Sequence, residues 1–113
     1  MEIPIENIIP NAVPTTKSAL QALAKEAAIK HGLNVSRFLA VIECESSWDT
    51  NAKGDYRKGE PTSFGLAQLH YPTRDWGIAT SSAYVPEIAL TLMAEAWVKN
   101  KQHKWSCYNI LYG

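Results

Sequence analysis

The chain has few cysteines and no excess of either charge. Its 113 residues include two cysteines, Cys44 and Cys107, and neither belongs to a Cys-x-x-Cys pair. This argues against a zinc knuckle or a thioredoxin-type site. Eleven Lys and Arg residues balance eleven Asp and Glu residues. Nucleic-acid binders usually carry a basic excess, so the balance argues against that class of protein.

Long apolar runs and common catalytic motifs are also missing. No run approaches the roughly 18 apolar residues of a membrane span. Residues 1–14 lack the basic start and continuous apolar centre of a signal peptide. The sequence has no Gly-x-Ser-x-Gly, no His-Glu-x-x-His and no glycine-rich phosphate loop, and its three histidines are scattered. We therefore expect no membrane span, no resident metal and no cofactor.

The sequence does contain a series of helix signals. The predicted helices are 19–31 with Ser18 as N-cap, 37–48 with Ser36 as N-cap, one from Pro86 to about Asn100, and 106–111. No strand-like alternation of useful length is present. The pattern predicts an all-α fold, or nearly so, in one domain at 18–113, with an extended, proline-containing arm at 1–17.

One glutamate continues the apolar face of the second predicted helix. Phe38, Val41, Ile42 and Glu45 share a face at helical spacing, whereas Glu43 points elsewhere. Burial raises the pKa of a carboxyl group, and a glutamate protonated near neutral pH can act as a general acid. The alternative is a glutamate at the rim of the stripe, solvated or paired with a cation.

Several short motifs around this glutamate resemble the goose-type lysozyme and soluble lytic transglycosylase superfamily. They are Glu45-Ser46, the aromatic Trp48, the run Asp49-Thr50-Asn51-Ala52, then Gly65-Leu66-Ala67-Gln68, and Tyr108-Asn109 near the end. The likeness spans most of the chain, from Ser36 to about Asn109. It implies a lysozyme-like helical domain built around a central catalytic helix with a glycan cleft.

The resemblance also implies roles for individual residues. Glu45 matches the single catalytic acid of the family. The residues that match its substrate-binding positions are Ser46, Gly65, Leu66, Gln68 and Tyr108. The sequence departs from the family pattern at Asp49 and Thr50, which replace Asn-Pro, at Ala67, which replaces methionine, and at Ile110, which replaces alanine.

Three functions fit this resemblance. The first is a lytic transglycosylase that cleaves the MurNAc-GlcNAc bond of peptidoglycan and gives a 1,6-anhydro product. The second is a lysozyme that hydrolyses the same bond with help from an aspartate that positions water, Asp55 in preference to Asp49, unless Asp55 is simply a turn residue after Gly54. The third is an inactive glycan-binding or structural domain. We expect a monomer that acts outside the cytoplasm, at the cell wall or with a phage particle.

Aromatic residues fit a glycan cleft because sugar faces stack on flat rings. Tyr56 and Tyr71 stand in polar or loop surroundings and are the favoured candidates, with His70 placed near the cleft. Trp48, Trp97 and Trp105 are better explained as core residues.

The two cysteines adjoin residues that the resemblance places at the site, because Cys44 precedes Glu45 and Cys107 precedes Tyr108. A disulfide between them is therefore one expectation, and two free thiols are the other.

Overall fold

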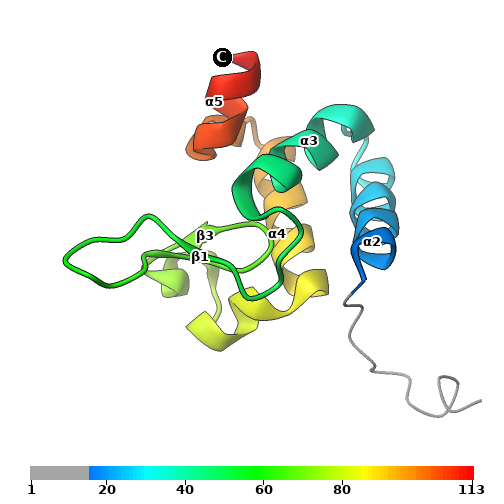
Figure 1. Ribbon diagram of the computed structural model, residues 1–113. Coiled ribbons are helices and arrows are strands. Elements are labelled where there is room, and N and C mark those ends of the chain that lie inside the picture. The colour runs from blue at the N-terminus through cyan, green and yellow to red at the C-terminus, as the bar shows by residue number, and fades with distance from the viewer. Residues whose placement is uncertain (1–15) are drawn as a thin grey trace, which may run out of the picture.

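The structure is a computed structural model that describes residues 16–113, so nearly all of the arm predicted at 1–17 lies outside the described residues. Figure 1 shows a mostly helical protein in which α2, α3 and α4 lie together, with a small sheet and its long loop to one side. The α-helices are α2 (Lys17–Lys30), α3 (Val35–Ser46), α4 (Pro86–Val98) and α5 (Ser106–Tyr112). Short 3-10 helices are η1 (Thr73–Trp76), η2 (Thr80–Tyr84) and η3 (Gln102–Lys104). The predicted helical class is therefore confirmed.

The first two described helices begin two residues earlier than predicted. The N-cap of α2 is Thr16, whose hydroxyl accepts the Ala19 N–H at 3.2 Å, and not Ser18. The N-cap of α3 is Asn34, whose side chain accepts the Arg37 N–H at 3.0 Å, and not Ser36. In each helix, a second polar residue two positions further along lies inside the first turn. The sequence therefore offers two N-cap candidates for the start of each helix.

A small sheet is the main departure from an all-α fold. The antiparallel strands β1 (Lys53–Gly54), β2 (Ser63–Phe64) and β3 (Leu69–His70) lie in that order. Ser63 pairs with both Gly54 and His70. Strands of two residues are too short to show the alternation of apolar and polar side chains that identifies a strand in sequence. The all-α prediction is thus wrong for the segment between α3 and η1.

The core lies where α2, α3 and α4 meet. Phe38, Val41 and Ile42 of α3 are fully buried, so most of the predicted apolar stripe is confirmed. The Phe38 ring packs edge-on against Trp97 of α4, with ring centroids 5.2 Å apart. Within residues 16–113, every helix is too short or too polar to cross a membrane.

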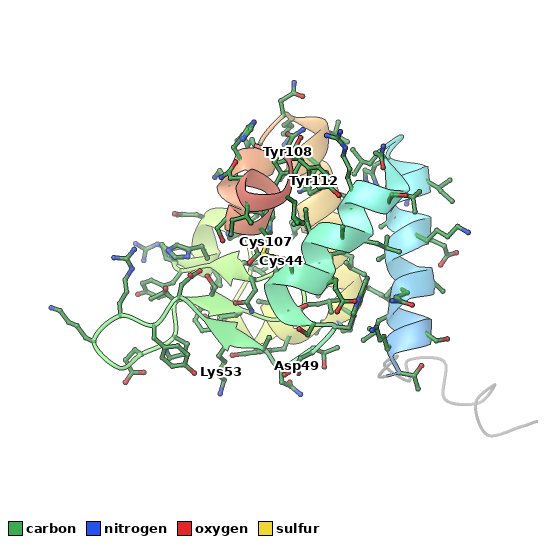
Figure 2. The ribbon with its side chains drawn as sticks, turned by 45° about the horizontal axis from the view of Figure 1, so that its top comes forward. Cys44, Asp49, Lys53, Cys107, Tyr108 and Tyr112 are labelled. Atoms are coloured by element: carbon green, nitrogen blue, oxygen red, sulfur yellow. A yellow bond between two sulfur atoms is a disulfide. The ribbon has the colours of Figure 1, made fainter. Side chains whose placement is uncertain are left out.

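A disulfide joins Cys44 of α3 to Cys107 of α5, which decides between the two alternatives for the cysteines. Figure 2 shows this bond at the centre of the molecule, between the end of α3 and the start of α5. It holds the short last helix beside the helix that carries Glu45.

The glycine at position 65 is required by packing, which gives a first prediction. Its φ is +79°, and a Cβ there would lie 1.9 Å from the Ala83 carbonyl oxygen. We expect Gly65→Ala to lower the free energy of unfolding by more than about 2 kcal/mol, since it adds a backbone clash to left-handed strain. Urea denaturation measures this loss.

Gly32 provides the matched control. Its φ is +69°, but nothing lies within 4 Å of a Cβ built there. Gly32→Ala should therefore cost only the left-handed strain, about 1 kcal/mol. Equal losses in the two variants would contradict the packing role of Gly65.

Candidate active site

Glu45 lies in the last turn of α3 and is partly buried. Its Oε2 accepts the backbone N–H of Cys107 at 3.0 Å, a bond between residues 62 positions apart in the chain. This contact exists only because α5 begins beside the end of α3, where the Cys44–Cys107 disulfide holds the two helices. The carboxyl group is therefore fixed in place while part of it stays accessible.

Burial raises the pKa of Glu45 above its usual value of 4.5. The negative charge of Asp55 raises that pKa further, because it opposes a second charge nearby. The Cys107 N–H and the Ser106 hydroxyl act in the opposite sense, since both stabilise the ionised carboxylate. Burial prevails, so Glu45 keeps its proton at a higher pH than an exposed glutamate does.

Glu43 has a different environment, on the exposed side of α3. Its Oε1 accepts the Trp48 indole N–H at 2.8 Å and lies 3.5 Å from the Lys17 ammonium. The Lys17 contact places the Glu43 carboxyl group beside the first turn of α2, and the Trp48 contact comes from the segment just after α3. The sequence-based distinction between Glu43 and Glu45 thus corresponds to two separate surroundings.

Asp55 belongs to a hydrogen-bonded network across the small sheet. The Ser63 hydroxyl donates to Asp55 Oδ2 and also lies 3.0 Å from Nδ1 of His70. His70 Nδ1 is 3.8 Å from the same Asp55 oxygen. Because Ser63 and His70 are cross-strand partners in β2 and β3, the sheet itself sets their spacing. Asp55 is thereby held in the position from which its charge acts on Glu45.

Asp49, the other aspartate weighed from the sequence, makes a local turn. Its Oδ1 accepts the Asn51 N–H at 2.9 Å, which is the usual Asx-turn bond. Asp55 is the aspartate whose charge affects the pKa of Glu45. The preference for Asp55 over Asp49 therefore agrees with the electrostatics.

Three of the residues matched to substrate positions have interior surroundings. The Ser46 hydroxyl is buried and donates to the Ile42 carbonyl at 3.1 Å. Leu66 is 1% exposed and lies in the core. Gly65 is buried against Ala83, so what a side chain would crowd there is the protein backbone. These three residues therefore pack in the protein interior, and their contact with a ligand stays a prediction.

Gln68 holds the turn between β2 and β3. Its side-chain nitrogen donates to the Ala52 carbonyl at 3.1 Å and to the Gly65 carbonyl at 2.9 Å. Its Oε1 faces Gly54 so closely that a Cβ there would lie 2.4 Å away. The amide therefore ties the loop after α3 to the turn, while other atoms of Gln68 line a cavity.

Tyr108 was expected beside the acid, but its ring packs in an aromatic cluster. The ring centroid lies 5.3 Å from that of Trp97 and 5.5 Å from that of Tyr112. Figure 2 labels Tyr108 and Tyr112 close together on α5. The group that reaches Glu45 belongs to the preceding residue, Cys107. Successive helical residues point about 100° apart, so a shift of one position moves a side chain to another face. Asn109 bonds to His103 and fastens η3 to α5.

A cavity of about 530 Å³ opens next to this network. Its lining includes Gln68, His70, Tyr71 and the two aromatic residues Trp76 and Trp105. Glu45 is not among its lining residues. Two routes connect the cavity to Glu45. His70 on the cavity wall bonds to Ser63, which bonds to Asp55, and Trp105 directly precedes Ser106 and Cys107, which act on Glu45. Residues that line the cavity therefore adjoin residues that act on Glu45, although Glu45 itself does not line it.

The two tyrosines predicted for a cleft differ in their places. Tyr71 is 61% exposed and lines the cavity, which fits the expected stacking surface. Tyr56 is equally exposed but lies in the long loop and does not line the 530 Å³ cavity. Trp48, Trp97 and Trp105 are buried, as predicted.

Sequence reasoning missed two parts of the site and the basic wall of the cavity next to it. The Cys107 N–H carries no side-chain signature, and the role of the buried Ser63 depends on a strand pairing that the sequence does not show. The three lysines on the cavity wall, Lys99, Lys101 and Lys104, form a visible basic run in the sequence, and this signal could have found them. Among residues 16–113, no three His, Cys, Asp or Glu side chains gather in a way that would hold a metal ion.

The coupling between Asp55 and Glu45 gives a second prediction. Asp55→Asn removes the negative charge, and asparagine tolerates the φ of +51° at this position. We expect the pKa of Glu45 to fall in this variant, as followed by carbon-13 NMR of its side-chain carboxyl group. Asp49→Asn is the control and should leave that pKa in place. An unchanged Glu45 pKa in Asp55→Asn would contradict the coupling.

Comparisons with protein-family models, with curated proteins and with solved structures found no match to this chain.

Proposed function

We propose that the protein is a lytic transglycosylase that cleaves the β-1,4 bond between MurNAc and GlcNAc in peptidoglycan. The observation that carries this proposal is Glu45, a partly buried carboxyl group with a raised pKa, held by the Cys107 N–H beside an aromatic-lined cavity. The motif resemblance points to the same residue, and a lysozyme-like arrangement of the helices is part of the proposal. Because the substrate is cell-wall material, the protein would act outside the cytoplasm or at cell lysis.

One carboxyl group is enough for this reaction. Protonated Glu45 donates its proton to the glycosidic oxygen as the bond to the anomeric carbon breaks. The resulting Glu45 carboxylate then takes the proton from the 6-hydroxyl of the muramic acid residue. That oxygen attacks the anomeric carbon and closes the 1,6-anhydro ring, so no water is consumed. Attack from within the same sugar replaces an encounter with water, which lowers the entropic barrier.

Hydrolysis of the same bond is the second candidate, and Asp55 favours it. Both contacts of the Asp55 carboxylate, with Ser63 and with His70, use Oδ2. Oδ1 can then orient a water molecule toward the anomeric carbon, which gives the second carboxylate that hydrolytic glycosidases use. In this case Asp55→Asn would abolish activity, whereas a transglycosylase would retain it with an altered pH profile.

Mass spectrometry of digested peptidoglycan tests the proposal directly. A transglycosylase leaves anhydro ends, which are lighter by one water than the reducing ends left by a lysozyme. Anhydro products would support the first candidate, and reducing ends would replace it with the second. Intact glycan strands after prolonged incubation would exclude both and leave a binding or structural domain.

A further inference from the structure

Three lysines on the wall of the 530 Å³ cavity form no ion pair with an acidic side chain of residues 16–113. Lys99, Lys101 and Lys104 all come from the end of α4 and the η3 segment that follows it. Within residues 16–113, no carboxylate oxygen lies within 4.0 Å of any of their ammonium groups. Unpaired positive charges around a concave surface concentrate anionic ligands there. The cavity volume is in the range of sites that hold small ligands.

The other residues that line the cavity indicate which kind of anion it can bind. The Lys104 ammonium lies 5.4 Å from the centre of the Trp76 ring, so charge and aromatic surface occur together. Asp75 and Glu95 also line the cavity. These carboxylates would repel a uniformly charged phosphate polymer. A short peptide that carries carboxylates, amides and an amino group can satisfy both signs of charge and rest apolar parts on the ring.

We propose that this cavity binds the acidic peptide branch of peptidoglycan, so that the protein acts preferentially on glycan strands that carry their peptides. This inference rests on the proposed function and specifies its substrate. The location supports it, because Gln68 and His70 line the cavity at the edge of the Glu45 and Asp55 site. The peptides branch from muramic acid, so a strand cleaved at Glu45 would place a branch close to the lysines.

Binding can be measured without any cleavage. The probe is the synthetic tetrapeptide L-Ala-D-isoGlu-L-Lys-D-Ala, titrated into the full chain and followed by amide NMR shifts. We expect shifts around residues 99–104 and Trp76, and their loss when the peptide carboxylates are amidated. Equal shifts with the amidated peptide, or shifts only with poly(glycerol phosphate), would overturn the proposal.

Cleavage then separates this proposal from the proposed function. The substrates are glycan strands with their peptides and the same strands stripped by an amidase. The variant is Lys99→Gln, Lys101→Gln and Lys104→Gln combined, and the control is Lys25→Gln, Lys30→Gln and Lys58→Gln, which changes the charge equally away from the cavity.

We expect the cavity variant to lose about tenfold in kcat/KM on peptide-bearing strands, the sum of three weak exposed ion pairs. Its activity on stripped strands should equal that of the wild-type protein. The control variant should have wild-type activity on both substrates. Equal losses on the two substrates would overturn the peptide site while leaving the enzyme proposal standing. Peptide binding without cleavage of either substrate would instead refute the enzyme proposal alone.

Discussion

Glu45→Gln is expected to lower the rate of glycan cleavage by at least about 100-fold, the contribution of a general acid. Glutamine has the size of glutamate and can still accept the Cys107 N–H through its side-chain oxygen, which in wild type is bound at 3.0 Å. It has no proton to donate to a leaving oxygen. Digestion of purified peptidoglycan, with products counted by mass spectrometry, measures the loss. Thermal unfolding of the same sample shows that the fold is kept.

Glu43→Gln is the matched control, two residues away on the same helix. It replaces one carboxyl group of α3 by an amide, as Glu45→Gln does, and it retains an oxygen to accept the Trp48 N–H. It loses only an exposed ion pair with Lys17, which is worth little. Activity close to wild type is therefore expected. Similar residual activity in the two variants would remove Glu45 from the role of acid.

The pH profile provides an independent check on the same residue. Because the pKa of Glu45 is raised, the acid stays protonated above pH 4.5, and the alkaline limb of kcat/KM should lie above that value. The same shift affects stability. The folded chain binds this proton more tightly than the unfolded chain, so Glu45 favours folding below pH 4.5, and this benefit is lost as the pH rises through the folded pKa.

The part of the fold predicted best is the part set by local sequence. Phe38, Val41 and Ile42 follow the helical period, and Pro86 begins α4 as expected. The same period placed Glu45 at the edge of the core. The helix starts were less certain because Thr16 and Ser18, like Asn34 and Ser36, are all good N-caps. Only the position of the first turn decides between them.

The parts that escaped prediction depend on contacts between distant segments. Ser63 joins Asp55 to His70 only after three two-residue strands have paired. The Cys107 N–H reaches Glu45 only when α5 packs against α3. A motif match aligns residues but not directions, which explains why Tyr108 matched the family position while its ring joined Trp97 instead. A backbone donor such as the Cys107 N–H cannot be recognised from residue type, because every residue except proline carries one.

Loss of the disulfide is expected to cause the largest change in stability. Cys44 and Cys107 are 63 positions apart, and a cross-link over such a loop restricts the unfolded chain by about 4 kcal/mol in the chain-entropy account. The double variant Cys44→Ser and Cys107→Ser should therefore unfold at much lower urea concentration than the oxidised protein. Equilibrium denaturation, monitored by tryptophan fluorescence, measures the difference.

The reduced wild-type protein is the control, because it lacks the bond but keeps both cysteines. It should unfold at the same urea concentration as the serine variant and at a lower one than the oxidised protein. Equal stability of all three would contradict a native disulfide.

The serine variant also tests how α5 is held against the acid. The Trp105 indole N–H still donates to the Ala67 carbonyl at 2.7 Å, so the segment before α5 keeps one buried attachment. Any loosening of the Cys107 N–H from Glu45 removes a bond that favours the ionised carboxylate, and the pKa of Glu45 should then rise further. An unchanged pKa of Glu45 in the serine variant would mean that the disulfide does not hold the donor against the acid.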